Sequence, residues 1–172
     1  ALVGFLSAAS YLRVGPLGVT AEIGSLARSA ADHARLLPQT LYGLDGFRET
    51  LDVLHEKDIR TVGAGLDGRS ARAPLVLKVK GERITILNFG EGEDLTAAGD
   101  GPGVCGWEIE RLASLVRDRK KRGDFVLVIG HAGLEYVPFP PPYVVAAYRA
   151  LSDAGADAVI GHHPHVPQGL EM

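Results

Sequence analysis

The pattern of apolar positions is clearest in the last third of the chain. Residues 125–129 form an uninterrupted apolar run, which predicts a strand buried on both faces. Apolar residues at helical spacing follow over 143–153, and Gly155 stands where many helices end. Residues 156–160 predict a second buried strand. A strand, loop, helix and strand in this order normally form a right-handed parallel crossover, so the predicted fold class is α/β.

Weaker patterns predict the elements that precede this unit. They are helices over 21–37, 45–57 and 107–122, a short strand over 59–62, and a hairpin over 74–89 that turns at Gly81-Glu82. Residues 90–106 are rich in glycine and show no periodicity. We therefore expect a long loop there, of the kind that is often functional or mobile.

Composition narrows the class of protein. The net charge of −3 leaves no excess of basic residues for a nucleic-acid surface. The single cysteine, Cys105, excludes an internal disulfide, and no apolar run approaches the roughly 18–20 residues of a membrane span. The short apolar start has no preceding basic residues, which favours a core element over a secretory signal. Because the chain begins without Met, we expect a fragment of a larger gene product.

Four of the six histidines follow the two predicted buried strands. His131 comes just after the first, and His162, His163 and His165 come just after the second. Ligands of α/β sheets bind outside the carboxyl ends of strands, so these side chains are expected to share one rim. Neutral imidazole is a common ligand of zinc, manganese and iron. The pattern favours a divalent-metal site over acid–base use alone or a solvated histidine cluster.

The loop between the strands carries further candidates. Glu135 lies four residues after His131 and could be a ligand, a base, a substrate contact or an exposed loop acid. The prolines at 138 and 140–142 are expected to make a rigid wall, and binding to a proline-recognition domain is the weaker alternative. Gly161 would let the backbone approach a ligand closely.

Two other patterns are set aside. Residues 63–68 match the spacing of a dinucleotide-binding loop, G-x-G-x-x-G, but that motif must open a helix. Here Pro74 and a hairpin follow, with no helical pattern between. Asp32 and His33 on the first predicted helix are most simply a solvated helix face.

Several segments together resemble a known family. The most specific is Gly161-His-His-Pro-His165 with the residues up to Gly169, and it is supported by residues 131–136, 42–54 and 61–65. This combination is similar to the CapA-type poly-γ-glutamate capsule biosynthesis family, which belongs to the calcineurin-like metallophosphoesterase superfamily. The resemblance is clearest over residues 42–171.

The resemblance implies a single domain over 1–172 with a four-layer α/β/β/α sandwich, incomplete at its N-terminus, and a metal site at the strand ends. By resemblance His131, His163 and His165 match ligand positions. His162 and Glu135 match motif positions, and we assign them catalytic roles, with His162 orienting or protonating the scissile group. The expected cofactor is manganese, iron or zinc, as one ion or as the pair that the superfamily uses to activate a hydroxide and clamp a phosphate ester.

The sequence also departs from the family pattern. It has no counterpart of the early Gly-Asp strand end, the Asn-Leu-Glu segment, or the Asn-Asn-His segment with its Asp-Tyr-Gly. Either these pieces lie outside the sequence or they have been lost. The leading hypothesis is a metal-dependent hydrolase of capsule biosynthesis that acts on a small-molecule or polymer substrate, beside partner subunits of a polymer synthase. The alternatives are a non-catalytic assembly subunit and a family member repurposed for amide or ester chemistry; both the bacterial cytoplasm and the cell surface remain open as locations.

Overall fold

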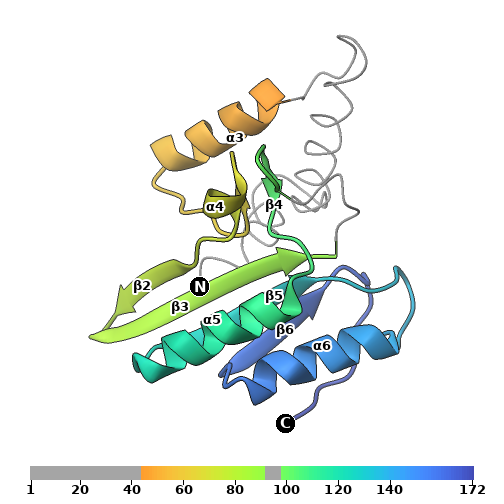
Figure 1. Cartoon of the computed structure of the whole chain (residues 1–172). Helices are drawn as coiled ribbons and strands as arrows, with labels where there is room; N and C mark the ends of the chain where they lie inside the picture. Colours follow the sequence, from red (N-terminus) through yellow and green to blue (C-terminus); the bar gives the residue numbers. More distant parts are fainter. Residues whose placement is uncertain (1–43, 92–97) are drawn as a thin grey trace. The chain divides into compact units, whose positions relative to one another are not determined.

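The computed structural model describes residues 44–91 and 98–172, and these fall into two compact units (Figure 1). The first unit contains the described parts of 1–75 and 92–106, and the second contains 76–91 and 107–172. The helix predicted over 21–37, with Asp32 and His33, lies outside the described residues, as does the apolar start of the chain. None of the described helices is long and apolar enough to cross a membrane.

The first unit is built on helix α3 (Leu44–Glu56), which confirms the helix predicted there. Its Phe47 packs against Ala64, with Leu51, Leu54 and Val104 around them. Strand β1 (Ala64–Gly65) pairs antiparallel with β4 (Gly103–Val104), which lies within the predicted loop. The strand predicted over 59–62 is therefore wrong: its β-branched residues suit a strand, but β4 pairs with Ala64 and Gly65 instead.

A short helix, α4 (Gly68–Ala71), follows β1 and corrects a second expectation, that no helix stands before Pro74. Asp67 starts it through a capping box, in which Asp67 Oδ1 accepts from the Ser70 amide at 2.7 Å and the Ser70 hydroxyl accepts from the Asp67 amide. The bond from the Ser70 amide holds the pKa of Asp67 below its usual value. The N-terminus of this short helix is therefore already capped by the Asp67 carboxylate. The presence of α4 thus does not support a dinucleotide-binding loop at residues 63–68.

The second unit is a mixed sheet in the order β2-β3-β5-β6, whose members are β2 (Leu75–Val79), β3 (Glu82–Gly90), β5 (Phe125–His131) and β6 (Ala158–His162). β3 and β5 are parallel, and so are β5 and β6. Helices α5 (Ile109–Lys121) and α6 (Pro142–Asp153) lie side by side over the sheet (Figure 1). This arrangement confirms the α/β class and is consistent with the predicted metallophosphoesterase-like fold, of which it supplies one β layer and one α layer.

Two details of this sheet differ from the prediction. The hairpin turns at Lys80-Gly81, one residue early, because both residues have the positive φ (52° and 91°) that a type I′ turn requires. Strand β6 is not buried on both faces, since it is the last strand of the described sheet and Ile160 is 50% exposed. β5 is buried as predicted along Val126, Val128 and Ile129.

A pair of glycines seats helix α6 on the sheet. Gly130 of β5 and Gly161 of β6 are register partners, and the ring of Tyr148 from α6 lies over both. A Cβ on either glycine would come within 2.7 Å of a Tyr148 atom. The Tyr148 hydroxyl donates to the Gly130 carbonyl at 3.2 Å. The close approach expected at Gly161 is thus made by a helix of the same chain.

The far end of the sheet is held by a buried carboxylate. Asp124, 1% exposed, accepts hydrogen bonds at 2.7 Å from both Thr85 Oγ1 and Arg83 Nε. Arg119 of α5 approaches it at 4.0 Å. Asp124 therefore links the start of β5 to β3 and to α5.

We expect Gly161→Ala to destabilise the fold by about 1–3 kcal/mol, because the new methyl group overpacks against the Tyr148 ring. Gly169→Ala is the matched control, since nothing lies within 4 Å of a Cβ there. Urea denaturation compares the two variants. Equal midpoints would contradict the seating of α6 on the glycine pair.

Asp124→Asn should lower the Tm by several degrees at pH 7. The hydrogen bond from Thr85, and next the bond and charge of Arg83, hold the pKa of Asp124 below its usual value. Such a group stabilises the fold above its unfolded pKa of about 3.9, and the stabilisation is lost as the pH falls through the folded pKa. The difference in Tm from wild type should therefore shrink below about pH 4. Asp118→Asn, which removes an exposed pair with Arg122, is the control and should change the Tm little.

Candidate metal centre

The parallel register brings three strand ends to one edge of the sheet. Gly90 of β3 is the partner of His131 of β5, and His131 is the partner of His162 of β6. The pairing continues one residue further on each side, with the Glu91 amide donating to the His131 carbonyl at 2.8 Å and the Ala132 amide donating to the His162 carbonyl at 3.1 Å. Both histidine-bearing loops thus leave the sheet together.

All four histidines expected at the site lie close together. The ring centroid of His131 is 4.8 Å from that of His162 and 4.5 Å from that of His163. The rings of His163 and His165 are 6.0 Å apart. The predicted convergence of the two loops is therefore present in the structure.

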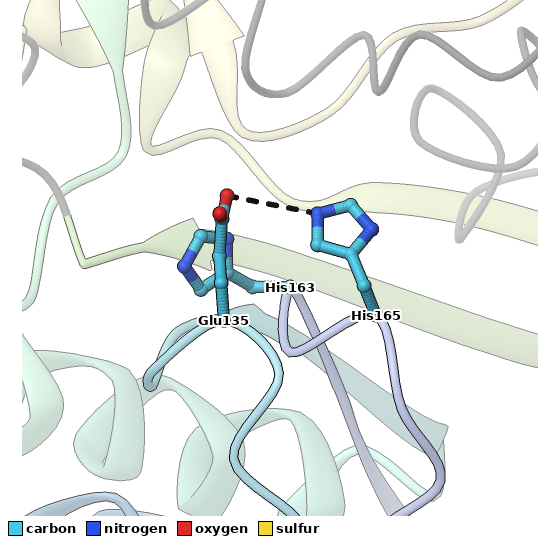
Figure 2. Close-up of side chains that lie close together, drawn as sticks. All are labelled: Glu135, His163 and His165. Carbon is cyan, nitrogen blue, oxygen red and sulfur yellow. Dashed lines mark ion pairs between the residues drawn. The ribbon is translucent and has the colours of Figure 1, made fainter.

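Glu135, His163 and His165 form the tightest group of potential ligands (Figure 2). One ligand atom from each lies within 4.8 Å of the others, and His165 Nε2 is 3.7 Å from Glu135 Oε1. Two ligands of one tetrahedral ion stand about 3.4 Å apart when each bond is about 2.1 Å. The three atoms are spaced somewhat more widely than that, and one carboxylate with two imidazoles is a donor set whose chemistry suits a divalent ion. The side chains of Glu135 and His165 are about half-exposed, so the group is open to solvent.

The two loops are also tied to each other. The Tyr136 amide donates to the Pro164 carbonyl at 2.8 Å, and Gln168 Nε2 donates to the Val137 carbonyl at 2.9 Å. The Tyr136 ring stacks on that of His165 at 5.7 Å and 26°. These contacts limit the positions that His165 and Glu135 can take relative to one another.

Three residues of these loops have a backbone conformation that favours glycine. The φ angles are 113° for His163, 59° for His165 and 60° for Tyr136. For residues with a Cβ this region is strained, and strain of this kind persists where surrounding contacts enforce it, often at functional sites. The strain lies in the segment that carries two of the three clustered side chains.

Burial keeps the inner histidines neutral. Desolvation, followed by the neighbouring imidazoles, lowers the pKa of His131 to about 3. The same causes, with desolvation again the largest, lower the pKa of His162 to about 4. At neutral pH both rings are therefore in the uncharged form that coordinates metals.

All the predicted residues lie at one site. The side chains that lie closest together, however, do not match the division into expected ligands and expected catalytic residues. Glu135, expected to be catalytic, lies with the expected ligands His163 and His165. His131, expected to be a ligand, lies between His162 and His163. The individual roles stay predictions.

One residue at the site, Glu91, was missed from the sequence. Glu91 follows β3 directly and accepts hydrogen bonds from the Gly133 amide and from the Tyr143 hydroxyl. The rule that pointed to the residues after β5 and β6 applies equally to the residue after β3. Glu91 was overlooked because it was counted with the glycine-rich loop.

Comparison with known proteins identifies the family of this chain. Residues 40–172 match the family described as bacterial capsule synthesis protein PGA_cap. The chain belongs to this family. It is 35% identical over 134 residues to the PGA biosynthesis protein CapA of Bacillus subtilis (strain 168), covering 76% of this chain and 35% of that protein. The resemblance to CapA-type proteins is thereby confirmed.

Other relatives carry related names. The capsule biosynthesis protein CapA of Bacillus anthracis is 34% identical over 139 residues, covering 77% of this chain and 34% of that protein. A probable polyglutamine synthesis accessory protein of Mycobacterium tuberculosis is 32% identical over 146 residues, covering 76% of this chain and 38% of that protein. The chain thus spans about a third of the length of these curated relatives.

The strain at His163 can be tested with two substitutions. His163→Gly should be more stable than His163→Ala by up to about 2 kcal/mol, because relief of an unfavourable φ is worth about 1–3 kcal/mol and added flexibility of the unfolded chain costs about 0.5–1 kcal/mol. The same pair at His162, the last residue of strand β6, where φ is not positive, should show the opposite order. Denaturant unfolding of the metal-free variants gives the comparison, and the same order at both positions would refute the strained backbone.

Proposed function

We propose that this chain supplies a divalent-metal site with hydrolase-type chemistry to poly-γ-glutamate or capsule biosynthesis. The observation that carries the proposal is the group formed by Glu135, His163 and His165, whose ligand atoms converge at the carboxyl edge of a parallel sheet. The names of the relatives support the polymer pathway. A polymer or a small molecule would be the substrate, and subunits of a polymer synthase would be the partners.

In this proposal Glu135, His163 and His165 hold the ion, and His131, whose ring neighbours that of His163, extends the site toward a second one. Manganese, iron and zinc suit this mixture of imidazole and carboxylate. When bound, the ion would act as a Lewis acid toward a phosphoryl or acyl oxygen. His162 would orient the scissile group or exchange a proton with it, and the exposed side of Glu135 and His165 would admit the substrate.

A second candidate function is a non-catalytic assembly subunit that keeps the fold and part of the site. The name of the Mycobacterium tuberculosis relative, an accessory protein, favours it. The hydrolase and the assembly subunit differ in one measurable property, which is whether the metal-bound protein turns over substrate.

Metal titration tests the site. His163→Ala and Glu135→Ala should each weaken Mn²⁺ or Zn²⁺ binding by more than about 100-fold, since even loss of a residue supporting a ligand costs about 10–100-fold. His55→Ala, an exposed histidine of α3, is the matched control and should bind like wild type. Isothermal titration calorimetry measures affinity, and elemental analysis measures metal content.

Activity is assayed on the same proteins with a phosphodiester and a γ-glutamyl amide. Turnover that falls together with metal content in His163→Ala would support the hydrolase. Full metal content without turnover on either substrate would favour the assembly subunit. Activity lost at full metal occupancy in His163→Ala would show that His163 is not a ligand.

A further inference from the structure

Glu91 connects the end of β3 to the loop that carries the proposed ligands. Its Oε2 accepts a hydrogen bond from the Gly133 amide at 2.9 Å, and its Oε1 accepts one from the Tyr143 hydroxyl. Its own amide donates to the His131 carbonyl at 2.8 Å. A single residue thus contacts the loop at its start and again two residues later.

Gly133 lies midway between His131 and Glu135, so its conformation decides where the loop goes after β5. Its φ is 107°, a value that glycine adopts without strain. An amide in this conformation can turn away easily unless an acceptor holds it. Glu91 is that acceptor.

Tyr143 in turn anchors Glu91 to a set of packed rings. The Tyr143 ring lies edge-on to Trp107 at 5.8 Å, and Trp107 lies edge-on to Phe89 at 5.4 Å. The hydrogen bond to Glu91, with burial as a smaller cause, raises the pKa of Tyr143 to about 12, so the hydroxyl stays a donor at neutral pH. The carboxylate is therefore held from one side by α6 and directed on the other toward Gly133.

We propose that Glu91 is a positioning residue that sets the path of the loop between His131 and Glu135, and that Tyr143 holds Glu91 for this task. Both carboxylate oxygens of Glu91 are engaged by Gly133 and Tyr143, so Glu91 acts through the loop. The consequence for metal binding rests on the proposed function. A change in the conformation of this loop would move Glu135 away from His163 and His165.

Hydrogen exchange of the metal-free protein tests the positioning itself. Glu91→Ala should speed amide exchange over residues 132–136 by about 10-fold or more and leave residues 158–161 of β6 unchanged. Glu91→Gln keeps an oxygen that can accept from Gly133, so it should restore much of the protection. Tyr143→Phe should have a smaller effect of the same kind. Glu171→Ala, which removes an exposed glutamate paired with Arg149, is the matched control.

Cobalt(II) titration of the same variants tests the consequence. Glu91→Ala should weaken binding about 10-fold and change the visible absorption spectrum, as loss of a residue supporting ligands does elsewhere. Glu91→Gln should recover the wild-type spectrum. Emission from Trp107 checks that the packed rings remain intact.

Unchanged loop exchange in Glu91→Ala would overturn the proposal. So would faster exchange across the whole unit, which would indicate a general structural role, or faster loop exchange with unaltered cobalt affinity and spectrum. If wild-type protein binds no cobalt while Glu91→Ala still loosens the loop alone, the positioning role stands and the proposed metal function fails.

Discussion

The parallel register of β3, β5 and β6 is the constraint on which the rest of this site depends. It places Gly90, His131 and His162 side by side at one edge of the sheet. A shift of one residue would turn every side chain of a strand to the other face. The buried apolar residues of β5 and the anchor at Asp124 oppose such a shift at the opposite end of the strands. Residues far from the imidazoles thus help to fix the positions of His131 and His162.

Packing on the helical face supports the same edge. Tyr148 fits over Gly130 and Gly161, the residues that immediately precede His131 and His162. The two glycines therefore allow α6 to approach the strand ends closely on one face of the sheet. The next residue of each strand, His131 or His162, directs its side chain to the other face. The link from Tyr143 of α6 through Glu91 to Gly133 extends this support into the loop. Helix, sheet and loop together position a group of donors that is strained and partly exposed.

In the described part of the chain, the elements follow from local patterns wherever the pattern is long. The amphipathic helices and the buried run of β5 were predicted because periodicity repeats over many residues. The strand predicted over 59–62 failed because a two-residue ladder is selected by its partner, β4, and not by its own composition. The turn at Lys80-Gly81 was misplaced by one residue because two positive φ angles define it, and only one of them belongs to a glycine.

For the site, the sequence alone determined that the four histidines would meet, since parallel strands end at one edge and the histidines stand directly after two of them. It also carried the motif by which family membership was recognised and then confirmed. Only the tertiary structure decided how these residues group: Glu135 with His163 and His165, His131 with His162, and Glu91 with Gly133 and Tyr143. The reason is physical: a parallel crossover, which chain connectivity predicts, brings both strand ends to one edge, whereas side-chain neighbours across loops depend on backbone turns and packing that no short segment specifies.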